Sequence, residues 1–266
     1  MIVTLLTDYG RDDEFVGVCH AVVRGIHPGA EIVDLSHGIR RHAVREGAIV
    51  LRNALPYLPP GVHVAVVDPQ VGTERRALAL RCADGQILVG PDNGVLSLAW
   101  TVAGGVVEAY DVSRSRHRLE PISATFHGRD VFAPVAAQLA AGAAPEEAGE
   151  PVEPDELTVL ELPAVRREGN GIVAHALTVD RYGNVGLNAG HGDLVGTELG
   201  LGREVELEIR GASKTGRIAQ TFADVGPAEL LVYEDANRTL AIAVNRGDAA
   251  ATLGLAVDDE VRLSSR

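Results

Sequence analysis

The stretch MIVTLLTDYGRDDEFVG (residues 1–17) decides the fold of the first half of the chain. Residues 2–7 form a short apolar run that stops at a turn, which predicts the first strand of an α/β domain. A dinucleotide-binding protein would place a glycine-rich phosphate loop after this strand, but the chain has Asp8 there. A carboxylate at this position repels phosphate and suits a pair of hydroxyl groups or a cation.

The segments after this strand alternate between helical and strand patterns. In order, the sequence predicts a helix over 12–26, a strand over 31–36, a helix over 43–57 and a strand over 61–69. This alternation predicts a mostly parallel sheet with right-handed crossovers. Farther on, the sequence predicts a hairpin about Asp84-Gly85 within 77–94, a short helix over 95–102 and a helix over 130–141.

The second half of the chain has a different pattern. The proline-rich acidic segment 145–156 lacks apolar periodicity, so we expect a linker there. From about residue 158 onward, short alternating segments are separated by Gly, Asp and Asn, which is typical of a small β-barrel or sandwich. We therefore expect an N-terminal α/β domain over 1–150 and a smaller C-terminal all-β barrel domain over 158–266.

Composition narrows the classes of partner. The chain has 24 Lys plus Arg against 37 Asp plus Glu, a formal charge of −13, which argues against nucleic acid as a general partner. Cys19 and Cys82 lie in apolar segments without metal or redox spacing, so both are predicted to be buried small hydrophobes. No apolar run is long enough for a signal segment or a membrane span, which predicts a cytoplasmic protein without membrane contact.

Polar residues follow several predicted strands, at the edge where an open α/β sheet binds its ligand. They are Asp8, Ser36, His37, Asp68, Asp92 and Asn93. Asp and Asn also cap helices and form turns, which explains Asp92 without a ligand. Arg75 follows Asp68 by seven residues, and the two form either a structural ion pair or part of a site.

Two further segments carry candidate residues. His127 precedes a predicted helix start and is either structural or catalytic. In VDRYGNVGLN (179–188), Asp180, Asn184 and Asn188 surround a Tyr-Gly turn, which either closes a hairpin or faces a ligand between domains. The sequence contains no phosphate-loop, zinc-peptidase, cysteine-cluster or nucleophile-elbow motif, which weakens NAD, ATP, zinc-peptidase and α/β-hydrolase interpretations.

Five motifs in fixed order resemble one family over nearly the whole chain. They are LLTDYG (5–10), VVDPQVGTERR (66–76), PDNG (91–94), TFHGRDVFAP (125–134) and DRYGNV (180–185). The chain resembles the S-adenosylmethionine hydroxide adenosyltransferases, which are relatives of the 5′-halo-adenosine synthases. The resemblance implies attack of water or hydroxide on C5′ of S-adenosylmethionine, giving adenosine and L-methionine without metal or cofactor. It also implies a homotrimer with sites between subunits.

The resemblance also implies roles for individual residues. Asp68, Arg75 and His127 match the water-activating set, two of which the halogenating relatives replace. Asp8 matches the residue that binds the ribose hydroxyls. Positions in the second half match substrate contacts: Asp180 for the methionine ammonium, Asn184 for adenine, Phe222 for adenine stacking, and the backbone near Asn245 and Arg246 for the adenine edge.

Two positions depart from the family pattern, and three alternatives stay open. Gln70 stands where the family usually has Gly, which has freer access to positive φ, and His42 stands where the halogenating relatives carry an aromatic residue. The alternatives are a chloride adenosyltransferase, a non-catalytic S-adenosylmethionine-binding module and a metal-dependent hydrolase. Retention of Asp68, Arg75 and His127 favours hydroxide over chloride.

Overall fold

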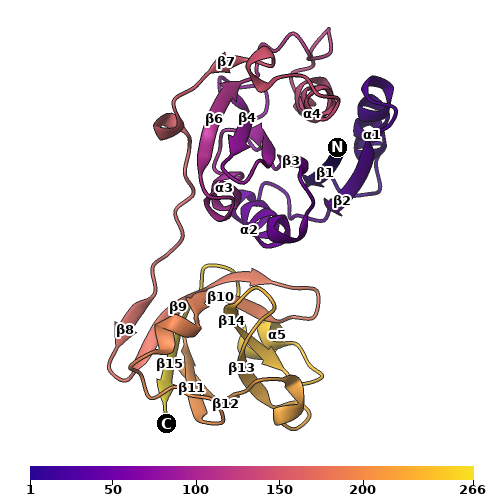
Figure 1. Ribbon diagram of the computed structural model, residues 1–266. Helices are drawn as coiled ribbons and strands as arrows, with labels where there is room; N and C mark the ends of the chain where they lie inside the picture. The colour runs from indigo at the N-terminus through magenta and orange to yellow at the C-terminus, as the bar shows by residue number, and fades with distance from the viewer. The chain divides into compact units, whose positions relative to one another are not determined.

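The computed structural model describes residues 1–266 and divides them into two compact units, Met1–Leu160 and Glu161–Arg266. The first unit runs from indigo into magenta in Figure 1, and the second runs to yellow. Every helix in the chain is too short or too polar to reach across a lipid bilayer.

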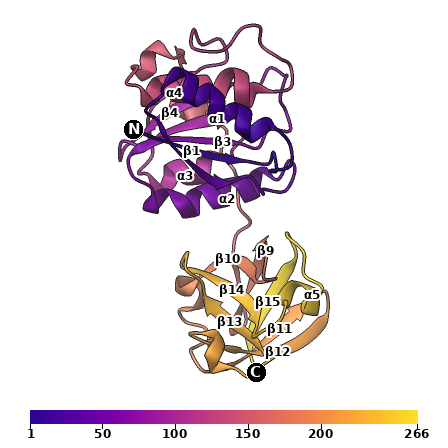
Figure 2. The same ribbon diagram turned by 90° about the vertical axis from the view of Figure 1, so that its right-hand side faces the viewer.

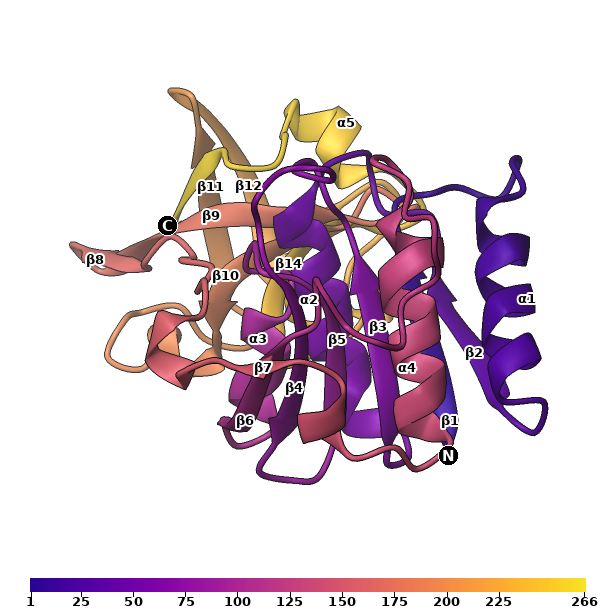
Figure 3. The same cartoon turned by 90° about the horizontal axis from the view of Figure 1, so that it is seen from above.

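The first unit is a seven-stranded sheet between two layers of helices, with α1 and α4 on one face and α2 and α3 on the other (Figure 2). Figure 3 shows its strands side by side from β2, next to α1, across to β6. The strands are β1 (Ile2–Thr7), β2 (Glu31–Ser36), β3 (Gly61–Val66), β4 (Ala77–Cys82), β5 (Ile87–Pro91), β6 (Val106–Asp111) and β7 (Glu150–Pro151). The helices are α1 (Phe15–Ile26), α2 (Val44–Ala54), α3 (Ser97–Val102) and α4 (Ala133–Ala140).

The sheet of the first unit is mixed, so the expectation of a mostly parallel sheet is wrong. The order is β2-β1-β3-β5-β4-β6-β7, in which β2, β1, β3 and β5 run parallel. The predicted hairpin about Asp84-Gly85 is confirmed, and it reverses β4 against β5. Strands β6 and β7 then pair antiparallel as well. A short turn allows only antiparallel pairing, whereas parallel strands need a long crossover.

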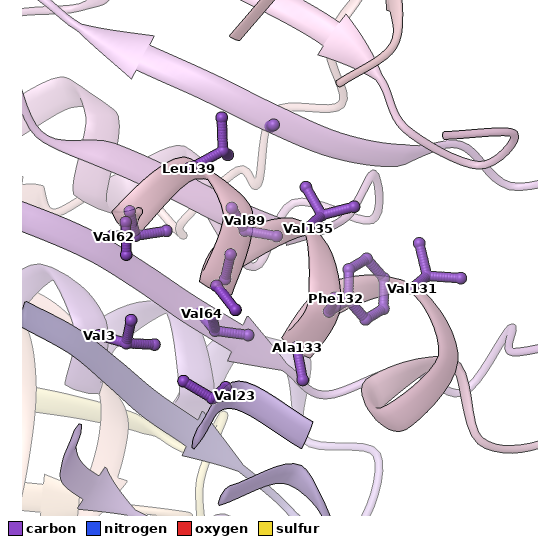
Figure 4. Packing of buried hydrophobic residues seen from close by; sticks show 14 of the residues in the cluster. Val3, Val23, Val62, Val64, Val89, Val131, Phe132, Ala133, Val135 and Leu139 are labelled. Carbon is purple, nitrogen blue, oxygen red and sulfur yellow. The ribbon is translucent and has the colours of Figure 1, made fainter. Parts of the chain in front are cut away.

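Two apolar clusters form the core of the first unit, one on each face of the sheet. On the α1 and α4 face, valines from β1, β3 and β5 pack against Val23, Phe132, Val135 and Leu139 (Figure 4). On the other face, leucines of β1, β4 and β5 pack against α2 and α3. Cys19 and Cys82 are buried in these clusters as predicted, and burial raises the pKa of each thiol to about 12. Both thiols therefore stay protonated and unreactive at neutral pH.

The second unit is the predicted β-barrel. Its strands follow the order β10-β14-β13-β12-β11-β15-β9-β8, and pairing of β9 with β10 closes a ring of seven strands with β8 outside it. Alternate residues of β10 and β11 are buried, as a barrel with a filled interior requires. The elements are β8 (Arg166–Glu168), β9 (Gly171–Val179), β10 (Val185–Gly190), β11 (Glu204–Ile209), β12 (Ala212–Ile218), β13 (Leu230–Glu234), β14 (Thr239–Val244), α5 (Ala249–Leu253) and β15 (Glu260–Ser265).

Candidate active site

Asp68 and Arg75 form a buried ion pair after β3. The Arg75 Nε atom donates to both carboxylate oxygens of Asp68, at 3.0 Å and 3.2 Å, and its Nη2 also donates to Oδ2. Each side chain is only 5% exposed. The guanidinium also lies over the Phe132 ring, 5.3 Å from its centroid. The Asp68 carboxylate and the Phe132 ring therefore hold the guanidinium in place. A group that stabilises developing charge requires such preorganisation.

His127 joins this pair through Arg75. Arg75 Nη2 donates a hydrogen bond of 2.9 Å to Nδ1 of His127. An arginine has no acceptor atom, so Nδ1 must carry the lone pair and the ring hydrogen must lie on Nε2. The structure thus brings together the three residues that the sequence predicted as one set, and it orders them as Asp68, then Arg75, then His127.

The surroundings of His127 keep its imidazole neutral. Burial lowers the pKa of His127 below its usual value, and the positive charge of Arg75 lowers it further against the opposing effect of Asp68. A neutral ring with its hydrogen on Nε2 is a hydrogen-bond donor that carries no charge of its own. In this state His127 can donate to a water molecule or a hydroxide ion.

The loop that carries Asp68 is shaped by Gly72, not by a glycine at position 70. Gly72 has φ +80°, and a Cβ atom there would lie 2.4 Å from the carbonyl oxygen of Ala124, so this glycine is required. Gln70 is absent from the residues with positive φ, and its carbonyl accepts from the Thr73 backbone N–H at 3.1 Å. The departure at Gln70 therefore leaves the loop conformation intact.

The segment before His127 is held by Asp130, which is 1% exposed. Its Oδ2 accepts from the Ser123 backbone N–H at 2.7 Å, and its backbone carbonyl accepts from Leu119 N–H at 2.8 Å. Burial raises the pKa of Asp130, but hydrogen bonds from Arg129 and Ser123 outweigh this and the net pKa is lowered. Asp130 therefore stays an anion and closes the loop that presents His127.

Tyr9 lies close to the candidate residues, and the sequence analysis did not select it. Its ring contacts Phe15 and Phe126, with centroids 5.9 Å and 5.7 Å away. Burial raises the pKa of Tyr9 well above its usual value, and the charges of Cys19, Asp8 and Asp68 raise it further. Its phenol therefore stays protonated close to the predicted site. The signal was available, because Tyr9 directly follows Asp8 in LLTDYG.

Replacing Gly128 with alanine is expected to destabilise the first unit. A Cβ atom at Gly128 would lie 2.2 Å from the Tyr9 hydroxyl, and the phenylalanines around Tyr9 prevent the ring from moving away. We expect a loss of about 1–3 kcal/mol in the free energy of unfolding, measured by denaturant titration. The matched control is Gly17→Ala, which meets no atom within 4 Å in helix α1. This control should gain about 0.5–1 kcal/mol, and equal stability of the two variants would contradict the clash.

Asp8 lies at the carboxyl end of β1, as predicted, and the structure shows how it is oriented. Its Oδ2 accepts a hydrogen bond of 2.9 Å from the backbone N–H of His42. His42 has φ +63°, a left-handed conformation that costs energy for a residue with a side chain. This conformation directs the His42 backbone N–H, and not its ring, to Asp8. One carboxylate oxygen of Asp8 is thereby fixed by the protein.

Other residues at strand ends have structural partners instead. Asp92 accepts from Arg76 Nε at 2.8 Å and from Thr158 N–H at 2.9 Å, and Asn93 donates to the Val67 carbonyl at 2.8 Å.

In the second unit, Asn188 accepts from His175 N–H and donates to the Pro163 carbonyl, both at 2.7 Å. Ser36 accepts from the Gly38 backbone N–H. These residues hold loops together, so the explanation by turns and caps applies to them.

In the second unit, Asp180 and Asn184 contact each other across a turn. Asp180 Oδ1 accepts from the backbone N–H groups of Tyr182 and Asn184, at 2.8 Å and 2.9 Å. Asn184 Nδ2 donates to Asp180 Oδ2 at 2.8 Å. Gly183 is required in this turn, because its φ is +79° and a Cβ atom there would lie 2.2 Å from Asp248. The turn therefore presents a fixed carboxylate and a fixed amide.

Tyr233 connects Phe222 to this turn, because it packs against Phe222 and lies close to Asp180. The two rings are 5.1 Å apart at their centroids, and Phe222 remains 38% exposed, which leaves part of it open for stacking. Burial raises the pKa of Tyr233, and the charge of Asp180 adds to the effect, so Asp180 also lies close by. Asn245 donates to the Val225 carbonyl at 2.8 Å, and the exposed Arg246 has φ +60°.

A cavity of about 360 Å³ lies beside Arg75 and His127. Arg114 and Arg118 also line it, and no Asp or Glu side chain does. This contrasts with the formal charge of −13 of the chain as a whole. Arg75 is paired with Asp68 and Arg118 with Glu120, so the cavity provides room for small molecules next to His127 but its arginines are largely neutralised.

Comparisons with family models and known proteins show which proteins this chain resembles. The model of the SAM hydroxide adenosyltransferase N-terminal domain matches residues 3–149, and that of the C-terminal domain matches residues 174–262. The crystal structure of an uncharacterized conserved protein from Thermotoga maritima superposes with a TM-score of 0.92 at 34% identity. The match covers 99% of this chain and 100% of that one.

Proteins of known name also resemble this chain over nearly its whole length. A protein named (R)-S-adenosyl-L-methionine hydrolase from Salinispora tropica is 46% identical over 99% of this chain and 97% of its own length. One of the same name from Thermus thermophilus is 40% identical over 98% of each chain. A fluorinase from Actinoplanes is 28% identical, over 94% of this chain and 92% of its own. Two matched domain models and these full-length similarities show that the chain belongs to the SAM hydroxide adenosyltransferase family.

Proposed function

We propose that the protein hydrolyses S-adenosyl-L-methionine to adenosine and L-methionine. The observation that carries this proposal is the buried hydrogen-bonded chain from Asp68 through Arg75 to a neutral His127, found in a member of this family. The relatives named as hydrolases are more similar to this chain than the fluorinases are, at 46% and 28% identity. The curated names specify the R configuration at sulfur, so we propose the R epimer of the sulfonium as the substrate.

The reaction is a substitution at ribose C5′. The oxygen of water forms a bond to C5′, the C5′–S bond breaks, and its electron pair remains on the methionine sulfur. One proton leaves the water and is released to solvent, so the charge of the sulfonium is balanced by this proton. Because the leaving group is a neutral thioether, the task of the protein is to place and polarise the water in line with the C5′–S bond.

The water-activating roles follow from the hydrogen bonds. His127 donates from Nε2 to the water oxygen, and the fixed charge of Arg75 stabilises the developing hydroxide. Asp68 orients the guanidinium, because its oxygens are occupied by Arg75. Attack of hydroxide on a sulfonium neutralises charge, so a water-poor site favours the transition state over the separated ions.

Substrate binding draws on residues of both units. We assign the ribose hydroxyls to Asp8, whose carboxylate suits a diol and explains why no phosphate loop follows β1. Asp180 accepts from the methionine ammonium, Asn184 contacts adenine, and the exposed part of Phe222 stacks on the base. The backbone near Asn245 and Arg246 binds the adenine edge.

We further propose a homotrimer in which each site combines the first unit of one subunit with the second unit of the next. The support is that the candidate residues are split between the two units, so neither unit alone holds a complete set. We propose that the reaction needs no metal or other cofactor, since the assigned residues supply all of its polar groups. We also propose a cytoplasmic location, where this substrate is found.

The test is to incubate chelator-treated protein with the R and S epimers of S-adenosylmethionine, with and without chloride, and to resolve the nucleosides by chromatography. We expect adenosine and methionine from the R epimer in both conditions. Formation of 5′-chloro-5′-deoxyadenosine would instead indicate a halide adenosyltransferase. Calorimetric binding without any product would indicate a binding module, and activity lost on chelation and restored by metal would indicate a metal-dependent hydrolase.

The pH dependence of kcat/KM tests the state of His127. Protonation of Nδ1 would remove the acceptor of the Arg75 hydrogen bond and place two cations in contact, so the neutral ring is the active form. Because burial and Arg75 lower the pKa of His127, activity should be retained as the pH falls to about 6.5 and be lost only below it. A loss of kcat/KM centred above this pH would contradict the assignment.

A further inference from the structure

A cluster of two histidines and one carboxylate lies outside the proposed reaction. Nε2 of His20, on α1, is 2.8 Å from Oδ1 of Asp34, on β2. Nε2 of His37, just after β2, is 3.0 Å from the same oxygen. All three ligand atoms lie within 4.8 Å of one another. None of these residues belongs to the set assigned to substrate.

His37 is the residue that indicates a ligand. Its side chain is 1% exposed, and its Nδ1 pairs with the Thr7 hydroxyl at 2.8 Å. Nε2 approaches Asp34 at an angle that makes no hydrogen bond, so this buried nitrogen has no hydrogen-bond partner in the protein. Buried polar atoms without a partner are rare in native structures. A metal-binding histidine has this arrangement, with one ring nitrogen fixed by a hydrogen bond and the other bound to the ion.

The three ligand atoms suit a divalent transition metal. Two imidazole nitrogens and one carboxylate oxygen are typical ligands of Zn²⁺, with a water molecule in the fourth position. At zinc–ligand bonds near 2.0 Å, tetrahedral ligand atoms lie about 3.3 Å apart. Asp34 Oδ1 lies 2.8 Å and 3.0 Å from the two imidazole nitrogens, and all three atoms lie within 4.8 Å of one another, so the ligands must shift to admit an ion. The His20 side chain, at 35% exposure, has the freedom to move.

We infer that His20, Asp34 and His37 form a binding site for one divalent transition-metal ion, with Zn²⁺ as the best fit. The ion would have a structural effect on the proposed ribose site. The backbone carbonyl of His37 accepts from Gly10 N–H at 2.8 Å, and the Thr7 hydroxyl accepts from Tyr9 N–H at 3.2 Å. Fixing His37 therefore braces the turn that carries Asp8, without any part in the chemistry.

The test is titration of Zn²⁺ into tag-free, chelator-treated protein, followed by calorimetry at pH 7.5 without substrate. We expect one Zn²⁺ per chain, and at least tenfold weaker binding for both His20→Ala and Asp34→Asn. His20 is partly exposed, so its variant should fold, and its thermal midpoint without metal should match that of the parent. The matched control is His191→Ala, an exposed histidine of the second unit, which should bind like the parent.

A second readout is the visible absorption of Co²⁺ in the same protein. We expect an intense tetrahedral spectrum that Zn²⁺ displaces and that is lost in His20→Ala. Absence of binding at one ion per chain, or equal affinity in the parent, His20→Ala and Asp34→Asn, would overturn the inference. The cluster would then be a network of histidines around Asp34 without an ion. Because substrate is absent, either result is independent of the proposed hydrolysis.

Discussion

Replacing Asp68 with alanine is expected to lower kcat by about 10²–10⁴-fold, the range typical of losing one group that acts on the transferring proton or orients those that do. Asp68 fixes Arg75 through two atoms of the guanidinium, and Arg75 in turn fixes His127. Without Asp68, both lose the geometry that polarises water. Affinity for S-adenosylmethionine should remain within about tenfold, or roughly 1.4 kcal/mol, because Asp68 is assigned to the water and not to the substrate.

Two variants control for this result. Asp68→Asn keeps the shape of the side chain while removing its charge, and should lose turnover as well without creating a cavity. Asp8→Ala removes a carboxylate from the ribose side of the proposed site and should weaken binding more than it lowers kcat. Single-turnover rates and calorimetric dissociation constants separate the two effects. Undiminished turnover in Asp68→Ala would remove Asp68 from the mechanism, and an unchanged dissociation constant in Asp8→Ala would remove Asp8 from the ribose site.

Mixing two impaired variants is expected to restore activity at substrate concentrations well below KM. Asp68 lies in the first unit and Asp180 in the second. In the proposed trimer, a working site needs the first unit of an Asp180→Ala chain beside the second unit of an Asp68→Ala chain. Random assembly from equal amounts gives this combination at about one quarter of the sites. Co-expressed chains carrying different affinity tags should therefore recover about one quarter of the parent kcat/KM, whereas each variant alone should fall well below that level.

The control for this experiment is a mixture of the separately assembled trimers without subunit exchange, which should show only the residual activity of the two variants. Light scattering after size-exclusion chromatography measures the mass of the assembly independently. Co-expressed chains without recovered activity would show that each site lies within one chain, and a monomer mass would exclude the trimer. Neither result tests the hydrolysis reaction itself, which is judged from the products that the parent protein forms.

The sequence alone determined the elements with strong local signals. The segments 2–7 and 31–36 form β1 and β2 with the predicted bounds. Their bounds could be predicted because the pattern of hydrophobic residues that favours a strand lies within the strand's own sequence. The hairpin at Asp84-Gly85 and the barrel strands followed from turn residues and alternation. The predicted helix over 130–141 is also present, although its first turn, Gly128–Phe132, is a π-helix ahead of α4. Strand β6 was missed, because its apolar residues alternate too weakly to stand out.

Five ordered motifs in the sequence also identify Asp68, Arg75 and His127 as one set. Only the tertiary structure decided how these residues act together: which atom of Arg75 contacts His127, which nitrogen of His127 holds the hydrogen, and how burial keeps the ring neutral. It also shows how Asp92, another acid at a strand end, holds a loop through Arg76 and Thr158. The physical reason is that hydrogen-bond direction and desolvation depend on atoms brought together from distant segments, which no local pattern encodes.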